Sequence, residues 1–265
     1  MKDDKSLVRQ AVTILENSVI AKGVFEMVVT YPQDFHTPLP GQFVDIYCNH
    51  QGRLLPRPIS VCEVRQVNSK RFLHLVYAAV GAGTTEFSQM KTGSVVEIMG
   101  PLGNGFTLSK GPGTALLVGG GVGTPPMVEL AKQLCKNSWN VKSVVGFRDE
   151  PYLVKRLEQF GEVFVATDSG KTGFHGNTLE LIRSAHMDMD VIYACGPKPM
   201  LQGVQEYAKE MSLPAQLSLE ERMGCGFGAC VGCVVKIVSG SETGFTYHKI
   251  CKDGPVFPAE EVIFS

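Results

Sequence analysis

Four cysteines near the C-terminal end of the chain have a spacing that suits metal chemistry. Cys225, Cys230 and Cys233 lie together in the stretch GCGFGACVGC, and Cys251 follows further on. Thiols placed in this way could form disulfides, bind zinc, hold an iron–sulfur cluster or share no role. The pattern C-x4-C-x2-C with a distant fourth cysteine is that of plant-type [2Fe–2S] sites, whereas structural zinc more often takes two compact ligand pairs. The spacing therefore favours a [2Fe–2S] cluster and leaves zinc as the alternative.

The same stretch is rich in glycine, at Gly224, Gly226, Gly228 and Gly232. Glycine adopts positive φ angles without steric cost, so it lets backbone amides approach sulfur, where their hydrogen bonds tune the potential of a cluster. We therefore expect these glycines to form part of the wrapping of the cluster.

Composition and charge exclude several classes of protein. The chain has 265 residues, a formal net charge of −1 and no long run of like charges, which gives no sign of nucleic-acid binding. The N-terminal MKDDKSLVRQ lacks the apolar stretch of a secretory signal, and no apolar run is long enough to span a membrane. We expect a cytoplasmic protein, and in that reducing compartment its 8 cysteines are more often thiols or metal ligands than disulfides.

The first part of the chain, residues 1–110, has the pattern of an antiparallel β domain. Short β-rich runs are separated by proline, glycine and polar clusters; examples are GVFEMVVTY, GQFVDIYC, FLHLVYAAV and GSVVEIMG. A short helix is expected at Thr85–Met90. We predict a closed Greek-key barrel for this part.

After the Gly/Pro-rich stretch GPLGNGFTLSKGPG, residues 111–214 alternate between strand and helix patterns. Strands are predicted at TALLVGGG, VKSVVGF, EVFVATDS and DVIYACG, and helices at PPMVELAKQLCK, EPYLVKRLEQF, NTLELIRSA and KPMLQGVQEYAKEM. Such alternation predicts a parallel sheet with crossover helices. The pattern ends near residue 215, and residues 215–265 are assigned to a small domain that carries the four cysteines. The predicted fold class is therefore multi-domain: an antiparallel β-barrel, a parallel α/β domain and a small C-terminal domain.

Two loops of small residues follow strands of the predicted parallel sheet. The stretch VGGGVGTPP contains Gly119, Gly120, Gly121, Gly123 and Thr124, and the stretch YACGP contains Cys195, Gly196 and Pro197. Glycine lets backbone N–H groups approach phosphate, and both loops would lie at the carboxyl edge of the sheet. Thr124 stands where the dinucleotide fingerprint has its third glycine, so the first loop alone is weak evidence. The two loops together indicate a nucleotide crevice.

The stretch LLPRPISV, inside the barrel part, holds a candidate phosphate contact. Arg57 lies between prolines that fix the backbone, and Ser60 follows in an extended run. A rigidly held guanidinium suits phosphate, and a hydroxyl beside backbone amides suits a heteroaromatic ring. The turn in VGAGTTEFS opens a short helix and adds a second geometry that favours anions.

Taken together, these motifs resemble the ferredoxin-reductase superfamily. The Arg-Pro-x-Ser strand, the GAGT turn, the GPLGNGF linker, the GGGVGTPPM loop and the CGP strand end follow one another along essentially the whole chain. The cysteine pattern that follows these reductase motifs narrows the choice of family within the superfamily. It is similar to that of the electron-transfer subunits of NAD-dependent (type 1B) dihydroorotate dehydrogenases.

The resemblance implies cofactors and the residues that bind them. FAD would contact the barrel residues Arg57, Pro58, Ile59, Ser60, Val76, Tyr77, Ala78, Gly83 and Thr84. NAD would contact Gly119, Gly120, Gly121, Gly123, Thr124, Cys195, Gly196 and Pro197. The [2Fe–2S] ligands would be Cys225, Cys230, Cys233 and Cys251. Ala78 stands where a larger polar residue is expected, so we expect a contact from its backbone alone.

The resemblance also implies a function. In this family a partner subunit oxidises dihydroorotate on FMN, and the electrons pass through the cluster and FAD to NAD+, as a step of pyrimidine biosynthesis. A flavin belongs between the other two groups because it exchanges both hydrides and single electrons. The resemblance also implies a heterotetramer of two copies of each subunit. We expect no general acid or base in this chain, and no nucleic-acid or membrane partner.

Two alternatives stay open. A related NAD(P)H reductase subunit could serve a hydrogenase, a ferredoxin or an oxygenase with the same cofactors. A zinc-stabilised nucleotide-binding regulator could use the same thiols without redox turnover. The choice of NAD over NADP also stays open from the residues, because GFRDE after the second strand contains both an arginine and acids.

Overall fold

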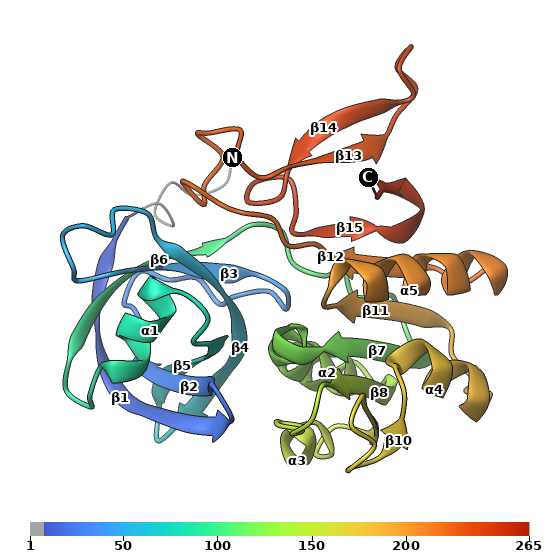
Figure 1. The fold of residues 1–265 in the computed structure, drawn as a ribbon, viewed down its shortest axis with the longest axis horizontal. Helices are drawn as coiled ribbons and strands as arrows, with labels where there is room; N and C mark the ends of the chain where they lie inside the picture. Colours follow the sequence, from blue (N-terminus) through green and yellow to red (C-terminus); the bar gives the residue numbers. More distant parts are fainter. Residues whose placement is uncertain (1–7, 265) are drawn as a thin grey trace.

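The computed structural model describes residues 8–264, which form three parts (Figure 1). A barrel lies on one side, a sheet with helices lies on the other, and a small C-terminal sheet lies above them. Within residues 8–264, no helix is long and apolar enough to cross a membrane. The expectation about a secretory signal concerns the first ten residues, of which residues 1–7 lie outside the described range.

The predicted barrel is confirmed. Its strands close in the order β1-β2-β5-β4-β3-β6, and each neighbouring pair is antiparallel. The elements are β1 (Gln10–Ala21), β2 (Val24–Thr30), β3 (Phe43–Tyr47), β4 (Arg57–Val67), β5 (Lys70–Ala78), α1 (Ala82–Gln89) and β6 (Val95–Leu102). Closure leaves no free sheet edge, and the inward side chains fill the interior with an apolar core.

The predicted parallel sheet is also confirmed, and it is larger than expected. Its order is β10-β9-β8-β7-β11-β12-β15, with β15 antiparallel to β12. The elements are β7 (Thr114–Gly120), α2 (Pro125–Lys136), β8 (Asn140–Phe147), α3 (Val154–Leu157), β9 (Glu162–Thr167), β10 (Phe174–His175), α4 (Thr178–Ala185), β11 (Val191–Cys195), α5 (Lys198–Glu210), β12 (Ala215–Ser218) and β15 (Val256–Pro258). Short 3-10 turns lie at Gly121–Gly123 and Ala259–Glu261.

The C-terminal part, residues 215–264, contributes to two sheets. β12 pairs with β11, and β15 pairs with β12, so the parallel sheet continues past the predicted boundary at residues 214 and 215. The strands β14 (Phe245–Lys249), β13 (Val234–Val238) and β16 (Val262–Ile263) form a separate sheet in that order. A short strand finds its partner through long-range packing, which explains why a break in the local pattern at residue 215 did not reveal this continuation.

The predicted helix over EPYLVKRLEQF is reduced to the single turn of α3. Leu153 has a left-handed backbone with φ +63°, which a right-handed helix cannot continue through. Tyr152 before it is buried against Phe147, with ring centroids 4.8 Å apart. Tertiary packing of this aromatic pair therefore replaces the first turns of the predicted helix.

Candidate functional site

The four cysteines of the C-terminal part lie in two pairs. The backbone N–H of Cys230 donates a hydrogen bond to Sγ of Cys225 over 3.4 Å, and the Sγ atoms of Cys233 and Cys251 lie 3.3 Å apart. β13 begins directly after Cys233 and pairs with β14, which ends shortly before Cys251. This hairpin returns the distant fourth cysteine to the other three. No disulfide forms among the cysteines of the described residues.

Backbone amides surround the sulfur of Cys225. Burial would raise the pKa of this thiol, but the N–H groups of Cys230, Phe227 and Gly228 point at the sulfur, and together they lower its pKa to about 6. Such hydrogen bonds stabilise the thiolate, which is the form that binds metal. The expectation that this loop brings amides to sulfur is therefore confirmed at Cys225.

Two of the four glycines in the thiol loop (residues 224–233) have the expected positive φ. Gly226 has φ +78° and Gly228 has φ +92°, whereas Gly224 and Gly232 do not enter that region. The carbonyl oxygen of Gly228 accepts a hydrogen bond from Nζ of Lys249 over 2.7 Å. Lys249 was not predicted as part of the site, and it ties the loop to the end of β14.

The donor set of the two thiol pairs fits a two-iron cluster. In a [2Fe–2S] cluster held by four thiolates each iron takes two of them, and the chain offers two thiol pairs, Cys225 with Cys230 and Cys233 with Cys251. Within residues 8–264, no three or more His, Cys, Asp or Glu side chains converge on one metal-ion position, which is consistent with two separate pairs of ligands.

The thiol pairs lie against the outer face of the barrel. Cys233 and Cys251 share one hydrophobic core with Phe43, Tyr47 and Met99, which project from β3 and β6. β3 is the direct neighbour of β4, the strand that carries the predicted flavin residues. The fold therefore brings the predicted metal site and the predicted flavin strand to one side of the barrel.

A buried carboxyl lies in this contact, and it was not predicted as a site residue. Asp45 of β3 is fully buried, and a side chain at Gly226 would lie 1.7 Å from its Oδ2. Neither carboxylate oxygen has a hydrogen-bond partner among residues 8–264. Burial, and after it the charge of the Cys225 thiolate, raises the pKa of Asp45 to about 7. The signal in the sequence is an acid inside the otherwise apolar run FVDIY.

Arg57 lies over the first turn of α1. Its Nη1 donates hydrogen bonds to the carbonyl oxygens of Leu55 and Pro56 over 2.6 Å and 3.3 Å. A Cβ at Gly83 would lie 2.5 Å from Nε of Arg57, so this close approach requires glycine. The first N–H groups of a helix have no intrahelical acceptor and favour anions. A fixed guanidinium over a helix N-terminus fits a diphosphate such as that of FAD.

Two of the predicted flavin residues use their side chains within the protein. Thr84 Oγ1 accepts hydrogen bonds from the N–H groups of Val80 and Gly81, each over 3.1 Å. The Tyr77 hydroxyl donates to Oδ1 of Asn17 over 2.9 Å, and the ring lies inside the barrel core. Because these side chains already have partners, Thr84 and Tyr77 would contact a cofactor through their backbone atoms. Of the remaining predicted residues, Pro58, Ser60 and Ala78 are half-buried, and Ile59 and Val76 are buried.

The two loops of small residues meet at one edge of the sheet, as predicted. β7 and β11 are parallel neighbours, with Gly119 opposite Cys195. A Cβ at Gly123 would lie 2.1 Å from the carbonyl oxygen of Cys195, and a Cβ at Gly120 would lie 2.8 Å from Cδ of Pro197. Gly123 meets the backbone of the second loop, so only glycine fits there, whereas a Cβ at Gly120 would meet the side chains of Pro197 and Met200.

Thr124 lies at the start of α2 with an unused hydroxyl. Its Oγ1 is buried and has no hydrogen-bond partner among residues 8–264, whereas its N–H donates to the carbonyl oxygen of Gly121 over 3.0 Å. An orphaned hydroxyl beside a glycine loop and a helix N-terminus fits a ligand that brings phosphate or ribose oxygens. Burial raises the pKa of Cys195 to about 12, so this thiol stays protonated at neutral pH.

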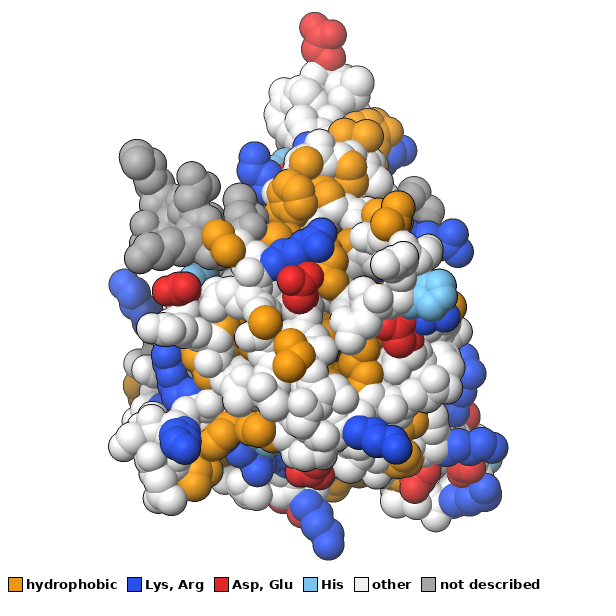
Figure 2. Space-filling view, turned by 90° about the vertical axis from the view of Figure 1, so that its left-hand side faces the viewer, with side chains coloured by type: hydrophobic (Ala, Val, Ile, Leu, Met, Phe, Trp, Pro, Cys, Tyr) orange, Lys and Arg blue, Asp and Glu red, His pale blue; other side chains and the backbone are white. Residues whose placement is uncertain are grey.

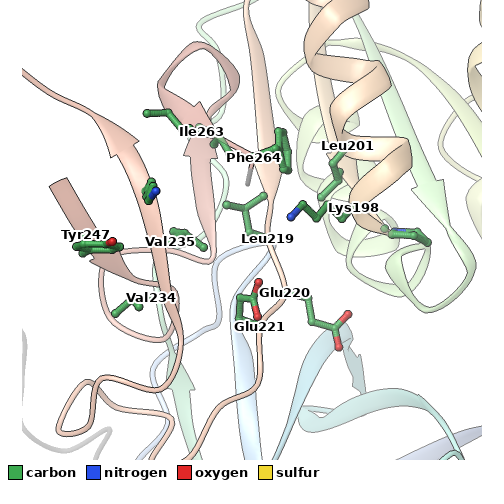
Figure 3. A pocket seen from close by; sticks show the side chains of 14 residues that line it. Lys198, Leu201, Leu219, Glu220, Glu221, Val234, Val235, Tyr247, Ile263 and Phe264 are labelled. Carbon is green, nitrogen blue, oxygen red and sulfur yellow. The ribbon is translucent and has the colours of Figure 1, made fainter. Parts of the chain in front are cut away.

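A cavity of about 400 Å³ adjoins the second of these loops (Figure 3). Lys198 and Leu201 line it from α5, Tyr247 lines it from β14, and Glu220 and Glu221 line it after the end of β12. This volume lies within the usual range for small-ligand sites. The cavity extends the predicted nucleotide crevice toward the C-terminal strands.

The face of the molecule on the barrel side carries charges of both signs. Figure 2 shows Lys and Arg side chains interspersed with Asp and Glu, and hydrophobic side chains gathered in the upper part of this view. Within the thiol loop, Phe227 is 41% exposed and Val231 is 71% exposed. The loop therefore presents apolar side chains to solvent next to its cysteines.

The C-terminal segment matches a known family of domains. Residues 220–263 match the model for the "Iron-sulfur cluster binding domain of dihydroorotate dehydrogenase B". This segment contains all four cysteines of the two thiol pairs.

Curated relatives match the chain along nearly its whole length. The "Dihydroorotate dehydrogenase B (NAD(+)), electron transfer subunit" of Geobacillus thermodenitrificans is 42% identical over 260 residues, covering 96% of this chain and 98% of the relative. The protein of the same name from Caldanaerobacter subterraneus is 42% identical over 252 residues, covering 95% and 97%.

Solved structures share the fold. A chain of the NADH-dependent reduced ferredoxin-NADP oxidoreductase aligns with a TM-score of 0.84 and 29% identity, over 95% of this chain and 89% of that one. The ferredoxin reductase in carbazole 1,9a-dioxygenase aligns with a TM-score of 0.67 and 21% identity, over 78% and 66%, and shows the fold alone. With relatives 42% identical over almost its entire length, this chain belongs to the family of electron-transfer subunits of dihydroorotate dehydrogenase B.

Proposed function

We propose that this chain carries electrons to NAD+ from an FMN-containing partner subunit. That subunit oxidises dihydroorotate, as a step of pyrimidine biosynthesis. The observation that carries the proposal is the packing of the thiol loop against β3, which pairs with the strand of the predicted flavin residues. Asp45, which touches this loop, stands opposite Pro58 in the register of β3 and β4. The one-electron site and the flavin strand are therefore adjacent within one chain.

The relatives carry NAD(+) in their name, and the C-terminal segment matches an iron–sulfur domain, so the chain is a flavin and iron–sulfur oxidoreductase subunit. When bound, a [2Fe–2S] cluster exchanges single electrons, a nicotinamide exchanges hydride, and a flavin exchanges both. Family membership favours this cluster over the zinc alternative.

In the proposal, residues of this chain bind and position the cluster, FAD and NAD+. The two thiol pairs hold the cluster, and the amides around Cys225 stabilise its thiolate. Arg57 and the first turn of α1 bind the FAD diphosphate. The loops that meet at Gly123 and Cys195 bind the NAD+ diphosphate, with Thr124 Oγ1 as a further contact. The proposal assigns no general acid or base to the described residues.

The thiol loop is the proposed docking surface for the catalytic subunit. Phe227 and Val231 expose apolar surface beside the cysteines, and apolar surface near a one-electron site suits a protein partner. A heterotetramer with two copies of each subunit, located in the cytoplasm, completes the proposal. A reducing cytoplasm would keep the thiols free for metal.

The test is reconstitution with the partner. We expect the chain to co-purify with an FMN-containing dihydroorotate dehydrogenase subunit and to give dihydroorotate-dependent reduction of NAD+. Iron, acid-labile sulfide, FAD and zinc are measured on the same anaerobic preparation. Stoichiometric zinc without flavin, or a stable complex that does not reduce NAD+ with dihydroorotate, contradicts the proposal.

A second candidate partner class follows from the likeness to the NADH-dependent reduced ferredoxin-NADP oxidoreductase chain, which is 29% identical. The same preparation is therefore assayed with NADH and a ferredoxin in place of the catalytic subunit. Electron transfer to ferredoxin at a rate above that with dihydroorotate and NAD+ favours this second function.

A further inference from the structure

The carboxyl of Asp45 has no structural explanation in the part of the chain that is described. It is fully buried in β3, and neither oxygen has a hydrogen-bond partner or an ion pair among residues 8–264. A buried carboxylate without partners costs several kcal/mol, so native proteins rarely keep one unless it has a functional role. Burial raises its pKa to about 7, as expected for a carboxyl without compensation.

The direction of this side chain follows from the strand. Val44 and Ile46 belong to the core inside the barrel, whereas Phe43 and Tyr47 belong to the core that includes the cysteines. Because side chains alternate along a strand, Asp45 points outward with Phe43 and Tyr47. It therefore projects from the barrel toward the thiol loop.

The contact with the thiol loop is tight. A Cβ at Gly226 would lie 1.7 Å from Oδ2 of Asp45 and 2.6 Å from its Cγ. The backbone next to Cys225 therefore rests directly on the carboxyl, and no side chain separates the two. Any negative charge on Asp45 acts on the thiols at short range.

The surroundings do little to screen this charge. Cys233 and Cys251 are buried in one apolar core with Met99, which stands opposite Asp45 in the register of β3 and β6. Charges in such an environment interact more strongly than charges in water. A cation does approach the loop elsewhere, because Lys249 donates to the carbonyl oxygen of Gly228, but it forms no ion pair with Asp45 within the described residues.

We propose that the carboxylate of Asp45 is a positioning and electrostatic residue that makes the cluster in the thiol loop harder to reduce. A fixed negative charge beside a centre that gains an electron disfavours the reduced form, which lowers its reduction potential. Asp45 thus sets the drop in potential between the one-electron site and the flavin on the neighbouring strand. It does so at the cost of an unsatisfied carboxylate in the interior.

The inference rests on the proposed function, because it needs a cluster at the two thiol pairs. The experiment separates the two. The full chain is purified anaerobically as wild type, Asp45→Asn, Asp45→Ala and Glu97→Gln. Iron, sulfide and FAD contents are measured first. The reduction potential of the cluster is then measured by electron paramagnetic resonance on samples poised with mediators at one pH, about pH 9, far above the ordinary pKa of an aspartate side chain.

We expect Asp45→Asn to raise the ratio of reduced to oxidised cluster at a fixed potential by about tenfold, equivalent to about 59 mV for one electron. Asp45→Ala shifts the potential in the same direction. Glu97→Gln is the matched control, because Glu97 lies on the neighbouring strand β6 but its side chain is 53% exposed. Solvent screens that charge, so the ratio changes by less than about twofold.

Each other outcome has a definite meaning. An unchanged potential in Asp45→Asn overturns the inference, and so does a shift in Asp45→Ala alone, because the side chain would then act by packing. Loss of the cluster from both Asp45 variants with FAD retained also overturns it, because the carboxyl would then be needed to hold the loop. A wild-type chain without any cluster overturns the proposed function instead.

Discussion

Arg156 and Glu26 form a bidentate ion pair between the nucleotide domain and the barrel. Nη1 of Arg156 lies 2.7 Å from Oε1 of Glu26, and Nη2 lies 3.0 Å from Oε2. Nδ1 of His74 lies 2.7 Å from the same Oε1. Glu26 and His74 are buried, so solvent and salt screen the pair little. The group therefore fixes how the barrel sits against α3.

Removal of Arg156 should destabilise the chain strongly. Arg156→Met leaves the Glu26 carboxylate buried without its partner, which typically costs about 3–5 kcal/mol. Urea unfolding followed by circular dichroism measures the loss. The control is Arg183→Met, because Arg183 pairs with Glu210 at the surface, where both side chains are about half exposed. A smaller loss for Arg156→Met than for Arg183→Met contradicts the prediction.

The same ion pair predicts a loss of stability in acid. Burial would raise the pKa of Glu26, but hydrogen bonds from His74 and Arg156 and the charge of Arg156 lower it to about 2. A carboxyl with a lowered pKa stabilises the fold above its unfolded pKa of about 4.5, and this contribution disappears as pH falls toward 2. Thermal unfolding of wild type and Glu26→Gln should therefore differ most near neutral pH and converge in acid. A gap that stays constant with pH argues against this assignment.

Replacement of one proposed ligand should remove the cluster and spare the flavin. In Cys230→Ser the proposed metal site loses one of its four thiols, and the iron and sulfide content should fall to a small fraction of wild type. The FAD content should stay near wild type, because Arg57 and α1 lie on the barrel. Cys135→Ser is the control, because Cys135 is exposed and lies in α2. Full cluster content in Cys230→Ser excludes Cys230 as a ligand.

Gly83, which lies against the guanidinium of Arg57, allows a direct test of the predicted flavin site. A Cβ at Gly83 would lie 2.5 Å from Nε of Arg57, whereas a Cβ at Gly81 would meet nothing within 4 Å. Gly83→Ala should displace the guanidinium and weaken FAD binding by about tenfold or more, about 1.4 kcal/mol. Gly81→Ala should bind FAD nearly as wild type does. Fluorescence titration of the flavin-free chain with FAD measures both, and equal affinities would place the diphosphate elsewhere.

The contact between the two nucleotide loops predicts a selective loss of NAD+ binding. A Cβ at Gly123 would lie 2.1 Å from the carbonyl oxygen of Cys195, so Gly123→Ala must push the loops apart. The KM for NAD+ should rise by about tenfold or more, with FAD retained. Gly240→Ala is the control, because a Cβ there meets nothing within 4 Å. An unchanged KM in Gly123→Ala means that NAD+ does not use this loop.

Local patterns in the sequence were enough to predict the helices and strands that depend on residues close together along the chain. Asn177 begins the predicted helix NTLELIRSA, and as its N-cap it accepts hydrogen bonds at Oδ1 from the N–H groups of Leu179 and Glu180. The helix α2 has the predicted bounds, because its two prolines and its apolar spacing act within a few turns. The alternation of strands and helices similarly predicted the edge at which the two glycine loops meet.

Contacts between residues that are distant along the chain could not be predicted from local sequence patterns. β12 and β15 join the parallel sheet from a segment that was assigned to a separate domain, because a short strand carries no mark of its partner. The pairs of Arg156 with Glu26 and of Asp45 with Gly226 join residues from distant parts of the chain. Arg156 and Glu26 alone have the pattern of ordinary polar positions, and the acid within the apolar run FVDIY does not show which segment it faces.

The sequence by itself determined which chemistry this protein has, because thiol spacing, glycine loops and strand periods are local properties of the chain. Only the tertiary structure decided how the parts act together. It closed the two thiol pairs through the β13–β14 hairpin, laid the thiol loop against β3, next to the strand of the predicted flavin residues, and buried one carboxyl, Asp45, in the contact. Burial and proximity set the strength of electrostatic interactions, and both exist only after the chain has folded.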